Sequence, residues 1–180
     1  MDNKILKEIL SYVWYIAIAF IAAFIITHFI IINTWVPTGS MNNTIMDNDK
    51  VIGLRFTYAF SSPKRGDIVI FKYPDDESRN FVKRVIGTPG DVVDISDGHV
   101  SVNGEILDEP YIKEPMDTSE TLHFEVPENS YFVMGDNRNN SNDARYWKTS
   151  NYVSKDNILA KGWLKYYNTQ SKKISFKILE

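Results

Sequence analysis

Cysteine is absent from this 180-residue chain, and histidine occurs only three times. The first absence excludes disulfide bonds, thiolate metal sites and cysteine nucleophiles together. The second leaves few candidates for a metal site or for a histidine-based catalytic triad. His28 lies in an apolar run, His99 beside a hairpin turn and His123 in a strand-like segment. We therefore expect neither a metal site nor a histidine base.

A strong excess of either charge is also missing, since the formal net charge is -3. No dense stripe of Lys and Arg appears, which argues against a general nucleic-acid binder. The remaining composition is that of a folded protein, with 43% hydrophobic and 13% aromatic residues. The length accommodates one domain with its own core and a short appendage.

Charged residues are missing from the apolar run "YVWYIAIAFIAAFIITHFIII", residues 12–32. About 20 apolar residues in a helix cross the roughly 30 Å hydrocarbon layer of a membrane. Trp14, Tyr15 and Trp35 near its ends fit an interfacial aromatic belt. A cleaved secretory signal is the alternative, but its apolar core is shorter and a small-residue cleavage site follows it. Bulky "IINTWVP" follows here, so we predict an uncleaved anchor at residues 12–33.

Basic residues flank this run unequally. Lys4 and Lys7 precede it, and no Lys or Arg follows until Lys50. The single apolar run predicts a protein of the cell membrane that crosses it once, and the positive-inside rule predicts its orientation. Residues 1–11 are expected in the cytoplasm, and residues 34–180 on the outer side.

Beyond the anchor, strand-like segments alternate with turn signals, and no helical periodicity of useful length is present. Asp97-Gly98 and Asn103-Gly104 are strong hairpin signals. We interpret 122–127 and 130–135 as a pair of strands. The predicted fold is all-β, a mostly antiparallel domain attached to one N-terminal transmembrane helix. Its expected strands are 50–60, 68–74, 79–87, 91–95, 99–103, 105–110, 122–127, 130–135 and 157–168.

Ser40, in "WVPTGSMNN", is a candidate nucleophile directly after the anchor. A nucleophilic serine needs a base, and a lysine base must be neutral. Its pKa must fall from about 10.4 toward 7 or 8, which requires burial among apolar groups. Lys83 shares a predicted strand face with Phe81 and Val85. Lys72 has a similar setting, and strand lysines are usually solvated, so the pattern alone does not choose between them.

A third feature is the segment "GDNRNNSNDARYW", residues 135–147, which follows an apolar strand. Its Gly, Asp, Asn and Ser residues indicate a tight loop at a strand end. Such a loop can supply hydrogen bonds to a site. The alternative is a surface turn with Asp143 and Arg145 as a local ion pair.

Four blocks, in this order, resemble those of bacterial type I signal peptidases, which are membrane-bound serine–lysine proteases. They are "PTGSM" with "NNTI" (37–45), "RGDIVIFKYP" (65–74), "KRVIGTPGD" (83–91) and "GDNRNNSNDARYW" (135–147). The resemblance implies a hydrolase that needs no cofactor and no metal. Its implied partners are membrane lipid and exported preproteins with Ala-x-Ala-like cleavage sites, and no nucleic acid.

The resemblance also assigns roles to single residues. It implies Ser40 as nucleophile and Lys83, rather than Lys72, as general base. Thr38 and the Ser40 N–H would form the oxyanion hole, and Ser141 would hydrogen-bond the lysine. Support would come from an ion pair between Asp143 and Arg145. An extended substrate would bind by β-addition, along pockets whose implied lining is Val36, Pro37, Met41, Ile45, Phe81 and Val82.

Departures from the family pattern are few. Thr38 replaces a common serine but keeps the hydroxyl donor, and Asn43 replaces a proline. Ala144 stands where serine is frequent, and Lys148 where glycine is common. None of these changes removes a catalytic group.

Three other interpretations differ in the sequence features that they require. A penicillin-binding or β-lactamase-like enzyme would need a Lys-Thr-Gly strand, which is absent from this sequence. A self-cleaving repressor-type protease would not need the anchor. A non-catalytic, membrane-anchored β module that binds peptides stays open.

Overall fold

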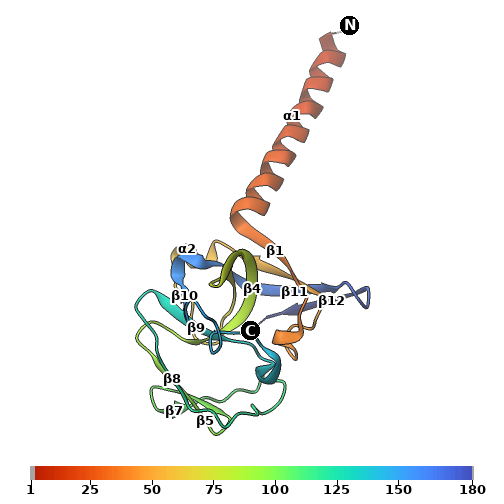
Figure 1. The fold of residues 1–180 in the computed structure, drawn as a ribbon. Coiled ribbons are helices and arrows are strands. Elements are labelled where there is room, and N and C mark those ends of the chain that lie inside the picture. The colour runs from red at the N-terminus through yellow and green to blue at the C-terminus, as the bar shows by residue number, and fades with distance from the viewer. Residues whose placement is uncertain (1–2, 180) are drawn as a thin grey trace.

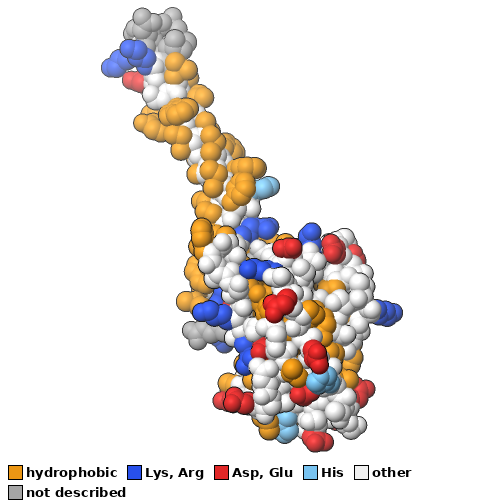
Figure 2. All heavy atoms as spheres, turned by 90° about the vertical axis from the view of Figure 1, so that its left-hand side faces the viewer, with side chains coloured by type: hydrophobic (Ala, Val, Ile, Leu, Met, Phe, Trp, Pro, Cys, Tyr) orange, Lys and Arg blue, Asp and Glu red, His pale blue; other side chains and the backbone are white. Residues whose placement is uncertain are grey.

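The computed structural model describes residues 3–179 and places one long helix above a β-rich body (Figure 1). Helix α1 covers Asn3–Ile25, and a single π-helical turn, η1, continues it over Ile26–Ile30. The segment Lys7–Ile30 is long and apolar enough to cross a membrane. Figure 2 shows apolar side chains along the visible face of this helix, which stands away from the body. Residues 31–33, the end of the predicted anchor, already lie in the first strand.

The larger of two sheets continues directly from the helix. Its hydrogen-bonded order is β1-β2-β11-β3-β4-β9-β10, and β12 pairs with β11. Consecutive pairs are antiparallel, as the register between β3 and β4 illustrates. The strands are β1 (Ile31–Val36), β2 (Asp49–Leu54), β3 (Ile68–Tyr73), β4 (Asp76–Gly87), β9 (Ser130–Met134), β10 (Val153–Ser154), β11 (Ile158–Asn168) and β12 (Lys173–Ile178).

The smaller sheet lies at the end of the body remote from α1 (Figure 1). Its order is β7-β6-β5-β8. The predicted hairpin turns join its strands: Asp97 and Gly98, and Asn103 and Gly104, all have positive φ, as type I′ turns require. The strands are β5 (Val92–Ser96), β6 (His99–Val102), β7 (Glu105–Ile106) and β8 (Leu122–Glu125). The prediction of a mostly antiparallel β fold with one N-terminal helix is confirmed.

Three predictions about strands were wrong in part. The expected strand 50–60 ends at Leu54, because its neighbour β1 begins at Ile31, the partner of Leu54. The next residues form the short helix α2 (Thr57–Phe60). Segments 122–127 and 130–135 do not pair with each other, since β8 pairs with β5 and β9 with β4. The expected strand 105–110 is also shorter, since β7 ends at Ile106. Strand β12 was not predicted. Short 3₁₀ turns complete the described chain: η2 (Gly39–Met41), η3 (Arg138–Asn140) and η4 (Lys155–Asn157).

Two apolar clusters cover the two faces of the central strands. On β3, Val69 and Phe71 belong to the cluster that includes Val93 and other residues of the small sheet. Ile68 and Ile70 point the other way, into a second cluster with Val36 and Val82. Burial on both faces explains why β3 is a continuous apolar run rather than an alternating one. It also means that a polar group in the buried part of these strands, such as Lys83 or Arg84, is desolvated.

Candidate active site

Ser40 and Lys83 lie side by side in the structure, although 43 residues separate them. Ser40 lies in η2, just after β1, and Lys83 lies in the buried half of β4. Lys83 Nζ donates a hydrogen bond of 2.6 Å to Ser40 Oγ and one of 3.2 Å to the Val82 carbonyl. Ser40 is 8% and Lys83 3% exposed. The distance is short enough for direct proton transfer between the two side chains.

Burial lowers the pKa of Lys83 to about 8, because desolvation penalises the ammonium form. The carboxylates of Asp143 and Asp136 oppose this shift, and the guanidinium of Arg145 adds to it. A substantial neutral fraction therefore exists at mildly alkaline pH. Lys72, the alternative that the pattern left open, is only half-buried on β3. Within the described residues no hydrogen bond joins Lys72 to Ser40.

Asn137 holds the turn that carries Ser40. Its N–H donates to the Ser40 carbonyl over 3.1 Å, and its Nδ2 donates to the Gly39 carbonyl over 2.9 Å. Gly135 makes this approach possible, since a Cβ there would collide with the Ser40 carbonyl oxygen and with Ser141 Oγ. Sequence analysis did not single out Asn137. Its only signal was its place in the polar 135–147 block.

A second buried network, also missed, lies behind the turn. Arg84 donates from Nε and Nη2 to the two oxygens of Asp136, over 2.9 and 2.8 Å. Thr44 Oγ1 donates to Asp136 Oδ2 over 2.5 Å. Arg84 directly follows Lys83, so the same strand delivers the lysine to one face and this arginine to the other. The network therefore links the strand of Lys83, the loop of Asn137 and the segment after Ser40.

The ion pair predicted between Asp143 and Arg145 is present and buried. Arg145 donates from Nε and Nη2 to the two carboxylate oxygens, over 2.8 and 2.9 Å. Asp143 Oδ2 also accepts from the Gly135 N–H over 3.0 Å. This pair is thus built into the loop that holds Ser40, and it lies close enough to Lys83 to act on its pKa.

The two supporting hydroxyls differ in their geometry. Thr38 Oγ1 lies 3.5 Å from Ser40 Oγ and faces the same cleft. Ser141 is buried beside Gly135, but its Oγ has no hydrogen-bond partner among the described residues. The predicted hydrogen bond from Ser141 to Lys83 is therefore not formed here, because Lys83 Nζ is directed to Ser40 Oγ and the Val82 carbonyl instead.

A cleft of about 510 Å³ opens above this pair. Of the predicted lining residues, Val36, Pro37, Phe81 and Val82 line it together with Trp35, Thr38, Ser40, Arg79, Asn80, Lys83, Asn140 and Asn142. Met41 and Ile45 do not. Both are wholly buried and pack with Val36 and Val82 in the second apolar cluster. These two residues support the cleft from behind, and the prediction that they line it is corrected.

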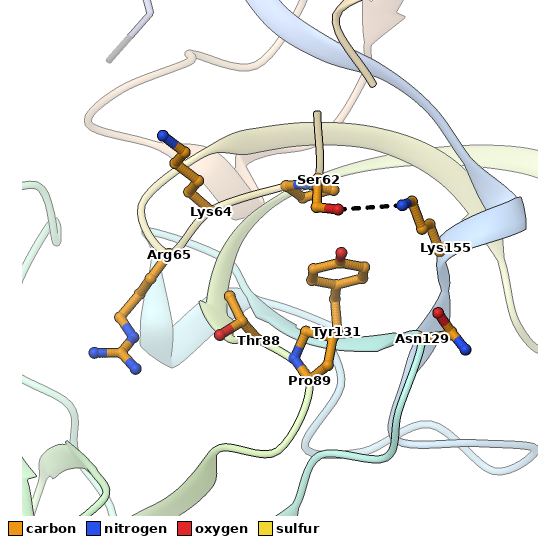
Figure 3. A pocket seen from close by; sticks show the side chains of 9 residues that line it. Ser62, Lys64, Arg65, Thr88, Pro89, Asn129, Tyr131 and Lys155 are labelled. Atoms are coloured by element: carbon orange, nitrogen blue, oxygen red, sulfur yellow. Dashed lines mark hydrogen bonds between the residues drawn. The ribbon is translucent and has the colours of Figure 1, made fainter. Parts of the chain in front are cut away.

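A second hollow, of about 380 Å³, lies elsewhere on the body and is drawn in Figure 3. Lys155 Nζ donates to Ser62 Oγ over 3.1 Å, above the ring of Tyr131. Lys64 and Arg65 point away from its centre (Figure 3). Its lining holds no buried nucleophile beside a base. No group of three potential metal ligands occurs within the described chain.

Comparison with known proteins gives consistent matches. A family model described as signal peptidase, peptidase S26, matches residues 9–167. A probable signal peptidase I-2 from Synechocystis sp. is 39% identical over 138 residues, which cover 74% of this chain and 62% of that protein. Signal peptidase I from Leptolyngbya laminosa is 37% identical over 141 residues, covering 74% and 67%. The match thus spans less than two thirds of the first of these relatives.

Among solved structures, a signal peptidase I from Enterococcus faecalis V583 aligns with 56% of this chain and 97% of its own. The identity is 29% and the TM-score 0.49.

Proposed function

Because this chain belongs to the signal peptidase family, peptidase S26, we propose that it is a membrane-bound serine endopeptidase that removes N-terminal signal peptides from exported preproteins. The observation that carries the proposal is the 2.6 Å hydrogen bond between Ser40 and the buried Lys83. A binding module has no use for a desolvated lysine against a serine, whereas a hydrolase does. The lowered pKa of Lys83 supports the same conclusion.

The proposed reaction proceeds through an acyl-enzyme. Neutral Lys83 Nζ takes the proton of Ser40 Oγ, which attacks the scissile carbonyl carbon. The Thr38 hydroxyl and the Ser40 N–H stabilise the oxyanion. Lys83 then protonates the leaving amine, so the peptide C–N bond breaks and the mature chain departs. A water molecule, deprotonated by the same lysine, hydrolyses the ester and frees the signal peptide.

The substrate is proposed to bind as an extended strand in the cleft, with small residues at the first and third positions before the cut. Val36, Pro37, Phe81 and Val82 supply the apolar walls. We expect these walls to favour Ala-x-Ala-like sites over large side chains.

The position of the helix fits this substrate. A helix long and apolar enough to cross a membrane leads directly into β1, and Ser40 follows soon after β1 ends. We assign residues 1–11 to the cytoplasm and place the membrane span from residue 12 to Ile30, where the helix ends. Residues 31–33, which the sequence assigned to the anchor, then belong with 34–180 to an extracytoplasmic peptidase domain. Membrane lipid is then a partner, and the cleft lies near the depth at which a signal peptide leaves the bilayer.

The test uses the full chain in phospholipid–detergent micelles with a preprotein that carries an Ala-x-Ala site. Wild type should release the mature protein at that site, and Ser40→Ala should retain the preprotein without cleaving it. Cleavage by Ser40→Ala at near the wild-type rate would show that Ser40 is not the nucleophile. Binding without cleavage by both forms would favour the peptide-binding module.

A further inference from the structure

Arg79 lines the cleft at a distance from the reacting pair. Arg79, Phe81 and Lys83 alternate along β4, so their side chains lie on one face of that strand. The Phe81 ring lies between the two cations, with Arg79 Cζ 5.3 Å and Lys83 Nζ 5.4 Å from its centroid. Lys83 is buried, whereas Arg79 is exposed in the outer part of the cleft.

An aromatic platform holds the Arg79 guanidinium. The Tyr73 ring stacks on that of Phe81, with centroids 4.2 Å apart and planes 4° from parallel. Arg79 Cζ lies 5.8 Å from the Tyr73 centroid. Trp147 packs edge-on against Tyr73, and Asn142 donates to the Tyr73 hydroxyl. Cation–π contact with two rings restricts this side chain more than solvent alone would.

No carboxylate of the described chain forms an ion pair with Arg79. Asp76, in the same hairpin, interacts with it only at longer range. Asp75 accepts hydrogen bonds from the Lys148 and Thr149 N–H groups, and Glu77 from Asn157. The guanidinium therefore keeps donors available to a ligand.

The charge of the cleft has one sign. Its charged lining residues are Arg79 and Lys83, and no Asp or Glu lines it. Such a field attracts anionic groups and repels cationic ones. Because Lys83 must be neutral to act as a base, Arg79 carries the permanent positive charge.

The geometry of β4 determines which part of a bound substrate Arg79 would face. A strand advances about 3.3 Å per residue, so each residue of a peptide extended along β4 lies beside one residue of that strand. Arg79 precedes Lys83 by four positions. When the scissile bond lies at Ser40, the substrate residues before it lie along Phe81 and Val82. Arg79 then faces the substrate residue about four to six positions before the cut.

We propose that Arg79 is a specificity-determining residue that favours a carboxylate side chain four to six residues before the cleavage site. The inference rests on the proposed function and deepens it by naming a charge preference in the substrate. Arg79 is a binding residue and takes no part in the bond-making steps. An ion pair formed at a partly exposed site should raise kcat/KM about three- to five-fold over a neutral side chain.

The experiment is a charge swap on the full chain in micelles. Three preproteins carry Glu, Gln or Lys at the fifth position before one Ala-x-Ala site, and companion sets move the charge to the fourth and sixth positions. Wild type should cleave in the order Glu, Gln, Lys. Arg79→Gln should cleave all three alike, and Arg79→Glu should invert the order. The wild-type preference should shrink as salt is raised.

Lys64→Gln is the matched control, because it removes one exposed positive charge outside the cleft and should leave the preference intact. Cleavage of the Gln substrate by every variant shows that the peptidase is intact. Equal wild-type rates on the Glu and Lys substrates at all three positions would overturn the role of Arg79 alone. No cleavage of any substrate by wild type would overturn the proposed function and this inference together.

Discussion

In the large sheet, Lys83 and Arg84 follow one another on β4 and both are 3% exposed. In the small sheet, Asp94 and His123 pair across β5 and β8 over 2.6 Å, but with 40% and 58% of their side chains exposed. The first pair of charges is desolvated by apolar clusters on both faces of its strand. The second pair lies on a sheet face that water reaches. The hydrogen bond between His123 and Asp94 raises the pKa of His123.

This difference in burial determines how strongly each charged group depends on its protein surroundings. A buried charge must have a partner or lose its charge. Arg84 has Asp136 as its partner, whereas Lys83 faces a neutral serine and has a lowered pKa. In the exposed pair, water can solvate each charged side chain, so neither depends on its partner. Four substitutions test this contrast.

The largest effect is expected for Lys83→Ala. Loss of the base should reduce kcat on an Ala-x-Ala preprotein at least about 10³-fold. Lys72→Gln is the matched control from the neighbouring strand, and it should keep near wild-type activity. Thermal unfolding of both variants reports whether they fold. A Lys83→Ala enzyme that retains most of its rate would remove Lys83 from the mechanism.

Arg84→Met tests the buried partner pair. The change leaves the Asp136 carboxylate buried without its guanidinium, which should lower the free energy of unfolding by about 3–5 kcal/mol. Arg65→Met is the control, because Arg65 pairs with Asp91 at a site where its side chain is 39% exposed. That change should cost less than about 1 kcal/mol. Equal losses in urea unfolding of the two variants would contradict the role of burial.

Thr38→Val tests the proposed oxyanion donor, since it removes the hydroxyl and keeps the shape. We expect kcat to fall about 10²-fold with little change in KM, because the hydrogen bond forms with the developing oxyanion. Thr38→Ser keeps the donor and should remain close to wild type. A Val variant as active as the Ser variant would place the second donor elsewhere.

The smallest effect is expected for His123→Gln in the small sheet. The catalytic rate should not change. Because the pKa of His123 is raised in the folded state, any stabilisation by its pairing is present below about pH 6.5, the unfolded value, and is lost as pH rises through the folded pKa. The unfolding temperatures of variant and wild type should therefore differ slightly at pH 5 and coincide at pH 8. A loss of activity would show that the small sheet contributes to the site.

Local signals in the sequence predicted part of this fold well. The Asp97-Gly98 and Asn103-Gly104 turns depend on the backbone preferences of those residues alone, and both hairpins form. Strand partners depend on distant segments. The pairing of β8 with β5 and of β9 with β4 therefore could not be predicted from the local sequence. The unpredicted β12 is exposed along its length, so it lacks the buried alternation that marks a strand.

The candidate site divides in the same way. Ser40 and Lys83 were identified through blocks that resemble a known family, whereas strand alternation could not separate Lys83 from Lys72. Their difference is burial, which depends on what the rest of the chain places over each strand. Met41 and Ile45 were expected to line the cleft on the resemblance alone. Which side of the cleft wall an apolar residue occupies depends on packing against distant segments, and both are buried behind it.

The central claim is that burial lowers the pKa of Lys83 enough to give a substantial neutral fraction beside Ser40, and a titration of Lys83 tests this most directly. Lysine labelled with ¹³C at Cε can be titrated by NMR in the full chain in micelles, with Lys83→Met used to assign the signal. We expect a midpoint about pH 8, and kcat/KM should rise with pH through the same value. A Lys83 signal that titrates near the ordinary lysine value of about 10.4 would contradict the account.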